Sequence, residues 1–297
     1  AAAILEASGQ VKRPKKALFY GELGLDGRVR PVRGTALAVR AAKDAGLQLV
    51  TSAQSTLAGS VAKSLGVKPQ QLPVGLRTLQ DRMDPTVIRA SKIDTTAKYL
   101  NFRDVEVPNG SDILSQLVKA AKKKTPVLFV GPPGVGKTMI AARMPALLGP
   151  LRENLTPTYM ADLAGLARED GDIVRLRPFR APHHTISTAG LIGDAAFRPG
   201  EMSLASEGVF FMDEVLEFQR SGREAVEQAI RDGGIRLLRG NHRVELPGNA
   251  WLVMASNGCP CGYAGSRSRP CLCSASTRET WEKHLGDLQA RFKAIRI

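Results

Sequence analysis

The fold of this 297-residue chain is decided by the stretch Gly131-Pro132-Pro133-Gly134-Val135-Gly136-Lys137-Thr138, which follows the apolar run Val127-Leu128-Phe129-Val130. Its pattern, G-x-x-x-x-G-K-[ST], is typical of a loop between a strand and a helix that surrounds phosphates with backbone N–H groups. The positive end of the helix dipole adds to the attraction. We therefore predict an ATP site over Gly131 to Met139, in which Lys137 reaches the β- and γ-phosphates and Thr138 binds Mg²⁺.

Two acidic residues, Asp213 and Glu214, end the next apolar segment, which spans residues 208–214. Hydrolysis of a phosphoanhydride bond needs one carboxylate to hold Mg²⁺ and another to polarise the attacking water. We assign the first role to Asp213, which shares the Mg²⁺ with Thr138. The second, catalytic role falls to Glu214.

A polar residue, Asn257, follows the apolar segment over residues 250–255. An amide at the end of this strand can reach the γ-phosphate and the attacking water, which favours a catalytic sensor role. The alternative is an ordinary turn-forming asparagine before Gly258.

The order of elements predicts an α/β fold with a parallel sheet, because strands alternate with helices and end in polar residues. The expected helices span 111–121 and 222–231, and the expected strands span 127–130, 208–214 and 250–255. A hairpin with arms at 235–238 and 243–246 is expected before the last strand. We assign residues 111–297 to this P-loop core.

The N-terminal part, residues 1–83, predicts a small α+β unit joined to the core by a linker over residues 84–110. The segments 18–25 and 28–32 are expected to form a hairpin around the favoured turn Asp26-Gly27. The remaining expected elements are a helix over 35–45, a strand over 47–50 and a helix over 54–65.

The chain is strongly basic, with 42 Lys and Arg against 28 Asp and Glu and a net charge of +14. Residues 1–125 hold 21 of these cations and 10 of the acids, for a net charge of +11. Such an excess favours a polyanionic partner such as DNA, although it can also be solubilising surface charge. No apolar run approaches the roughly 20 residues that cross a bilayer, so we expect a cytoplasmic protein that does not contact the membrane.

Three further strings occur in a fixed order: Arg177 to Thr185 (RPFRAPHHT), Arg198 to Ala205 (RPGEMSLA) and Cys259 to Tyr263 (CPCGY). Together with the P-loop and the acidic pair, they resemble the magnesium-chelatase-like AAA+ family, specifically its ComM/YifB branch. The resemblance covers residues 105–297. Residues 24–34 resemble the end of that family's N-terminal domain, which has a Lon-C/S5-like α+β fold, so we expect only part of that domain here.

The resemblance implies an ATP-driven homohexameric ring that acts as a DNA branch-migration helicase on branched or single-stranded DNA. By the same resemblance, the expected hairpin corresponds to a hairpin that lines the pore of the ring and contacts DNA phosphates. That hairpin carries Arg236, Arg239, His242 and Arg243, which suit contacts to the DNA backbone. The alternative is a solvated surface hairpin.

Two paired histidines and a late arginine extend this comparison. We expect a structural or pore-loop role for His183 and His184, because adjacent side chains of an extended segment point apart and do not share a metal ion. Arg291 matches the family's trans-acting arginine finger, which would act on a neighbour's γ-phosphate. Ala290 and Lys293 replace the acids that flank this arginine in the family. We expect the core up to Ile297 to lack the family's helical lid.

All four cysteines lie within fifteen positions, in the pattern C-x-C-x₉-C-x-C: Cys259, Cys261, Cys271 and Cys273. Such clustering favours a local metal site over a disulfide framework, and four thiolates suit a structural Zn²⁺ ion. Reduced free thiols and an iron–sulfur cluster are the alternatives. The intervening Arg267 and Arg269, with Tyr263, could present a small basic knuckle to DNA.

Three functions remain open from the sequence. The first is a DNA-translocating ATPase, which the basic hairpin favours. The second is a chelatase-type ATPase that remodels a protein partner. The third is a nucleotide-binding module with weak hydrolysis, which the altered surroundings of Arg291 would favour.

Overall fold

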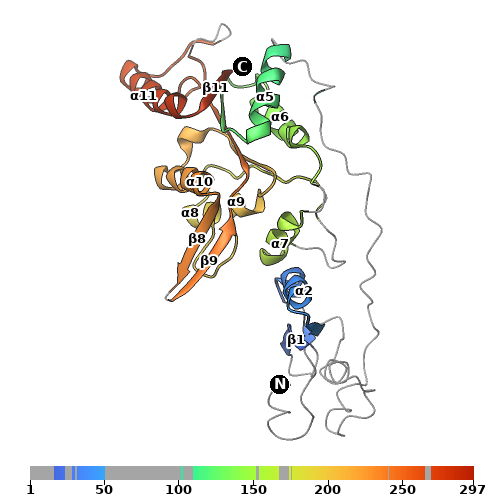
Figure 1. Ribbon diagram of the computed structural model, residues 1–297. Helices are drawn as coiled ribbons and strands as arrows, with labels where there is room; N and C mark the ends of the chain where they lie inside the picture. Colours follow the sequence, from blue (N-terminus) through green and yellow to red (C-terminus); the bar gives the residue numbers. More distant parts are fainter. Residues whose placement is uncertain are drawn as a thin grey trace, which may run out of the picture. The chain divides into compact units, whose positions relative to one another are not determined.

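The computed structural model describes residues 17–23, 29–30, 32–50, 102, 110–151, 154–166, 174, 176–239, 241–264 and 269–297. The chain divides into two units (Figure 1), the first comprising 1–93 and 161–173 and the second comprising 94–160 and 174–297. The expected turn at Asp26-Gly27, the helix over 54–65, Arg267 and nearly all of the linker over 84–110 lie outside the described residues.

A five-stranded parallel sheet forms the centre of the second unit, in the order β11-β5-β10-β7-β6. Its strands are β5 (Val127–Val130), β6 (Phe179–Arg180), β7 (Val209–Met212), β10 (Trp251–Ser256) and β11 (Lys293–Arg296). The predicted α/β fold with a parallel sheet is confirmed. Neither β6 nor β11 was predicted, because β6 has only two residues and β11 buries only Ile295.

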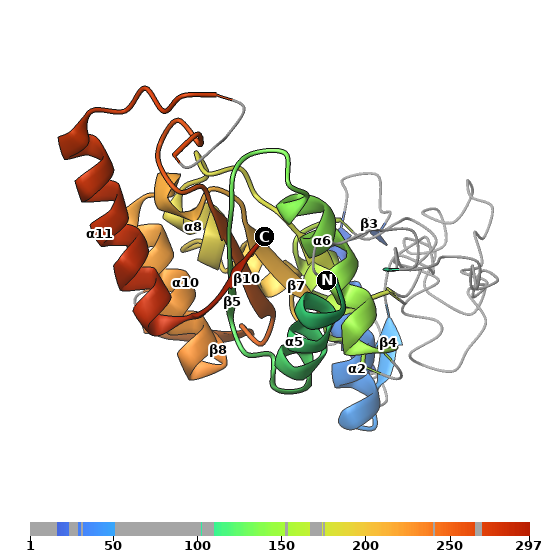
Figure 2. The same ribbon diagram turned by 90° about the horizontal axis from the view of Figure 1, so that it is seen from above.

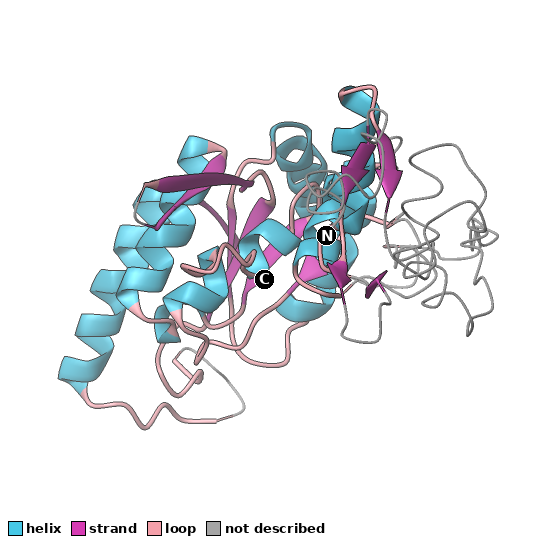
Figure 3. Ribbon diagram, turned by 90° about the horizontal axis from the view of Figure 1, so that it is seen from below, coloured by secondary structure: helices cyan, strands magenta, loops and turns pink. Residues whose placement is uncertain are grey.

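Helices flank the sheet, with α5 and α6 on one side of the strands and α8, α10 and α11 on the other (Figure 2). The helices of this unit are α5 (Gly110–Lys123), α6 (Lys137–Arg143), η3 (Met144–Leu148), α7 (Thr156–Leu163, which continues to the first unit), α8 (Thr188–Ile192), α9 (Glu201–Leu204), η4 (Val215–Glu217), α10 (Arg220–Asp232) and α11 (Ala275–Arg291). Colouring by secondary structure shows the same layers, with the strands of the central sheet lying between helices (Figure 3).

The core lies where these layers meet. Phe129, Phe211 and Trp251 come from the three central strands, are fully buried, and pack with Leu117 of α5 and Ile140 of α6. Burial of such side chains contributes about 1.5–3 kcal/mol each to folding. The central strands are apolar on both faces, as expected for a sheet covered on both sides.

A hairpin extends from the second unit, away from the sheet (Figure 1), and consists of β8 (Gly234–Arg239) and β9 (His242–Pro247). It follows α10 at Gly233, whose φ of +67° ends the helix in the left-handed conformation that glycine adopts freely. The predicted hairpin is confirmed and is one residue longer at each end than expected.

The first unit contains α2 (Thr35–Asp44) beside two short strand pairs. β1 (Ala17–Phe19) pairs in parallel with β4 (Gln48–Val50), and β2 (Glu22–Leu23) pairs antiparallel with β3 (Val29–Arg30). The predicted hairpin is present at these two strands, whereas Leu18 and Phe19, which it was expected to include, pair with β4 instead. None of the helices in the described parts of the chain is long and apolar enough to cross a membrane.

Candidate functional site

The P-loop connects β5 to α6 and surrounds the amino group of Lys137. Gly134 and Gly136 adopt left-handed φ values of +83° and +93°, which keep the loop tight. Lys137 is only 8% exposed, and its Nζ donates to the carbonyl oxygens of Gly131 and Pro132, each at 2.8 Å. Burial lowers the pKa of Lys137, while the carboxylates of Asp213 and Glu214 act in the opposite direction.

The strand order explains how Asn257 reaches this loop. β10 lies between β5 and β7, so the residue after β10 stands between the P-loop and the acidic pair. Lys137 Nζ donates to Asn257 Oδ1 at 2.9 Å, across 120 positions of sequence. The amide oxygen of Asn257 thus faces the region where Lys137 would meet a phosphate group.

Thr138 and Asp213 form the second contact across the site. Thr138 Oγ1 donates to Asp213 Oδ2 at 2.7 Å. A hydroxyl from the first turn of α6 and a carboxylate that directly follows β7 are oxygen ligands that Mg²⁺ accepts beside a nucleotide, so the donor set fits this ion.

Glu214 follows Asp213 with a left-handed backbone, at φ 51° and ψ 52°, which is uncommon outside glycine. Its Oε2 lies 3.9 Å from Nδ1 of His184, and its carboxylate is half exposed. Sequence reasoning missed this contact, although the RPFRAPHHT string contains the histidine. The expectation that His183 and His184 point apart is wrong, since their ring centroids lie 4.1 Å apart.

The two other family strings meet through Arg180 and Glu201. Arg180 Nε and Nη2 donate to the two carboxylate oxygens of Glu201 at 2.6 and 2.7 Å. This two-pronged contact holds β6 next to α9 and raises the pKa of Arg180. It gives both strings a structural role beside the site.

Arg291 lies at the end of α11 and contacts Glu227 of α10. Arg291 Nη1 donates to Glu227 Oε2 at 2.5 Å, and that carboxylate is only 8% exposed. Arg231 contacts the same oxygen at 3.9 Å. The trans-acting role of Arg291 stays a prediction, and it requires this arginine to leave Glu227.

The hairpin of β8 and β9 carries its arginines beside one carboxylate that sequence reasoning did not weigh. Glu245 Oε1 lies 3.5 Å from Arg236 Nε and 2.5 Å from Arg243 Nη2, and all three side chains are more than half exposed. His242 is exposed near the turn, and the side chain of Arg239 lies outside the described parts of the chain.

The four cysteines converge on one point. The Sγ atoms of Cys259, Cys261 and Cys271 are separated by 3.4 to 3.7 Å, and all four Sγ atoms, including that of Cys273, lie within 4.8 Å of one another. A Zn–S bond of about 2.3 Å puts the sulfurs of a tetrahedral site about 3.8 Å apart. The spacing therefore fits a single tetrahedral ion and is tight for a multi-iron cluster.

Hydrogen bonds to the sulfurs also suit thiolate ligands. The backbone N–H of Ala264 donates to Cys259 Sγ at 3.2 Å. Thiolates are the form in which cysteine binds a metal ion.

Comparison with known proteins adds to this geometry. The family described as "Magnesium chelatase, subunit ChlI" matches residues 106–295, and "Subunit ChlI of Mg-chelatase" matches residues 1–55. A solved structure of NtrX from Brucella abortus in complex with ADP has 18% identity and a TM-score of 0.33, over 52% of this chain and 31% of that chain.

Curated relatives match nearly the whole chain. An uncharacterized protein of Mycobacterium tuberculosis, Rv2897c, is 38% identical over 97% of this chain and 58% of its own length. Competence protein ComM of Haemophilus influenzae is 32% identical over 90% of this chain and 54% of its own length. YifB of Salmonella typhimurium is 30% identical over 91% of this chain and 54% of its own length. The chain spans about half the length of the curated relatives it matches. It belongs to the magnesium chelatase ChlI family of AAA+ proteins, in the branch that contains ComM and YifB.

Proposed function

We propose that this protein binds ATP with Mg²⁺, hydrolyses it, and uses the energy to move along branched or single-stranded DNA as a subunit of a homohexameric ring. The contacts of Lys137 with Asn257 and of Thr138 with Asp213 support the ATP site most strongly. They join three strand ends at one edge of the sheet, where ligands of open α/β folds bind.

Each residue has a role that follows from its position. Lys137 exchanges carbonyl and amide acceptors for phosphate oxygens, and Asn257, once released, is free to orient the attacking water. Bound Mg²⁺ would neutralise charge on the phosphate oxygens. Glu214, with its exposed carboxylate, accepts the proton of that water. Arg291 of a neighbouring subunit completes the site in a ring.

DNA as the partner is supported by charge. The chain has a net charge of +14, and the hairpin presents Arg236, His242 and Arg243 in an exposed position. Cations on a hairpin suit phosphate contacts that do not depend on base sequence.

We further propose that Cys259, Cys261, Cys271 and Cys273 hold a structural Zn²⁺ ion. Their mutual separation of no more than 4.8 Å supports one ion rather than a larger cluster. Four reduced thiols also favour a cytoplasmic location, where the redox conditions preserve them.

Replacement of Glu214 by glutamine tests hydrolysis. We expect Glu214→Gln to lower the ATP turnover of the full-length protein by about 100-fold or more, because the amide cannot accept the proton, with nucleotide affinity retained. The matched control is Glu217→Gln, which removes an exposed acid three residues away. Equal turnover of Glu214→Gln and the parent would remove Glu214 from the mechanism.

A further inference from the structure

The loop that carries the first two cysteines touches the nucleotide site directly. Cys259 follows Asn257 by two residues, and Gly262 packs against Pro133 of the P-loop. A Cβ atom placed on Gly262 would lie 2.9 Å from Pro133 Cδ and 3.7 Å from Asn257 Nδ2. The backbone of this turn therefore covers one side of the phosphate-binding loop.

The turn itself is held by the cysteines. Gly262 N donates to Cys259 O at 2.9 Å, and Ala264 N donates to the sulfur of Cys259, which is fully buried. Gly262 has a φ of +81° and is buried, so its close approach to Pro133 depends on the absence of a side chain.

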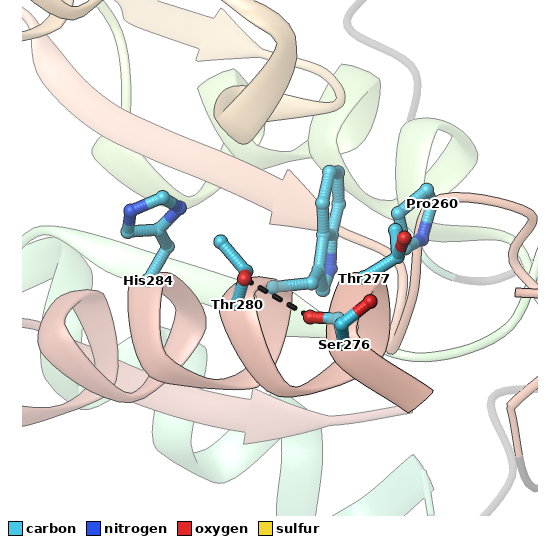
Figure 4. Close-up of a pocket in the computed structure, with 6 residues that line it drawn as sticks. Pro260, Ser276, Thr277, Thr280 and His284 are labelled. Carbon is cyan, nitrogen blue, oxygen red and sulfur yellow. Dashed lines mark hydrogen bonds between the residues drawn. The ribbon is translucent and has the colours of Figure 1, made fainter. Parts of the chain in front are cut away.

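The helix α11 supports the same segment from the other direction. Trp281 Nε1 donates to the carbonyl oxygen of Asn257 at 3.0 Å. Pro260 lies beside α11. Together with Thr277, Thr280 and His284 of that helix, it lines a shallow pocket of about 320 Å³ (Figure 4). Asn257 is thus held by Lys137 at its side chain and by α11 at its backbone.

The second pair of cysteines leads into this helix. Cys273 immediately precedes Ser274, and Cys271 lies two residues earlier. The side chain of Ser274 caps α11 by accepting from Thr277 N at 3.2 Å. The four sulfurs therefore connect the turn against the P-loop to the start of the helix that holds Asn257.

We infer that the metal ion held by the four thiolates positions the residues that bind the nucleotide. The ion fixes the turn at Gly262 and the start of α11, and thereby holds Pro133 and Asn257 in the geometry that binds ATP. This inference rests on the ATP and zinc sites proposed above. Loss of the ion frees the turn from α11, and the P-loop loses its support on that side.

Metal removal from the full-length protein tests the inference. Zinc content is measured by atomic absorption, and the Kd of a fluorescent ATP analogue is measured with excess Mg²⁺ before and after treatment with a zinc chelator. We expect stoichiometric zinc, a Kd about ten-fold weaker after its removal (about 1.4 kcal/mol), and recovery when Zn²⁺ is added back.

The outcomes separate the proposals. If zinc is removed and the Kd does not change, the positioning role is wrong and the zinc site stands. If the purified protein holds no metal, the zinc site is wrong and the inference falls with it. If the metal-loaded protein fails to bind the analogue, the ATP site itself is wrong.

A glycine variant tests the contact without touching a ligand. Gly262→Ala places a methyl group 2.9 Å from Pro133, so we expect retained zinc and a Kd about ten-fold weaker. Gly46→Ala is the matched control, because Gly46 also has a positive φ (+63°) but no atom within 4 Å of the added Cβ. Unchanged nucleotide affinity in Gly262→Ala, with a thermal unfolding midpoint like that of Gly46→Ala, would overturn the positioning role.

Discussion

Lys137 shows how the fold satisfies a buried cation. Three oxygen atoms accept from its amino group: two P-loop carbonyls at 2.8 Å and the Asn257 amide at 2.9 Å. A buried ammonium group without such partners would cost several kcal/mol. Phosphate oxygens of ATP can accept from Lys137 in place of these three oxygen atoms. Binding of ATP therefore exchanges existing hydrogen bonds of Lys137 for new ones and does not add to their number.

Thr138 provides a sharp test at the same scale. Thr138→Val keeps the shape of the side chain and removes the hydroxyl that contacts Asp213, so we expect Mg²⁺-dependent nucleotide affinity to fall about ten-fold or more. Thr138→Ser retains the hydroxyl and is expected to bind like the parent. The apparent Mg²⁺ affinity of both variants is measured by titration with Mg²⁺ at a fixed nucleotide concentration. Equal affinities of Thr138→Val and Thr138→Ser would exclude Thr138 as a ligand.

The candidate site was largely readable from sequence at this scale because its chemistry is contiguous. Eight adjacent residues define the P-loop, and one adjacent pair defines the acids. The contact of His184 with Glu214 could not be read in this way, since it depends on a left-handed backbone at Glu214. Likewise, no spacing rule places Gly262 against Pro133, because the approach requires the fold of both loops.

At the scale of elements, α10 and α11 are joined by the pair of Glu227 and Arg291. Glu227 is nearly buried, so its loss leaves arginines without their carboxylate. We expect Glu227→Gln to lower the free energy of unfolding by about 1–2 kcal/mol, measured by chemical denaturation.

A control for this pair lies on the same helix. Glu224 pairs with Arg220 at 2.8 Å, but both side chains are more than half exposed, so Glu224→Gln should leave the free energy of unfolding nearly unchanged. Equal losses in the two variants would show that burial of Glu227 contributes nothing.

The hairpin gives a second prediction at this scale. Glu245 neutralises part of the charge of Arg236 and Arg243, so Glu245→Gln should strengthen DNA binding several-fold at low salt. The gain should shrink as salt rises, because exposed charges are screened. Glu282→Gln makes the same charge change on α11, and an equal gain there would mean that overall charge, not the hairpin, binds the DNA.

Elements differed in how well the sequence predicted them. The strands β5, β7 and β10 are continuous apolar runs and were predicted, since they are buried on both faces. The edge strand β11 and the helix α11 were not, because each buries only one or two side chains. The cap at Ser274 was the available signal for α11.

At the scale of the whole molecule, the proposed ring requires that one subunit complete its neighbour's site. Glu214→Gln and Arg291→Ala should each be nearly inactive alone. In a one-to-one mixture of the full-length variants, some interfaces combine an intact Glu214 with an intact Arg291, so ATP turnover should reappear. A mixture as inactive as its components would show that Arg291 does not act between subunits.

The central claim is that ATP turnover serves movement on DNA, and it joins the nucleotide site to the basic hairpin. The most direct measurement is the ATP turnover of the full-length protein with and without branched DNA, at low and high salt. We predict that DNA raises turnover several-fold at low salt and that the increase declines at high salt. Turnover that is the same with and without DNA at low salt would contradict the account and favour a motor that remodels a protein partner.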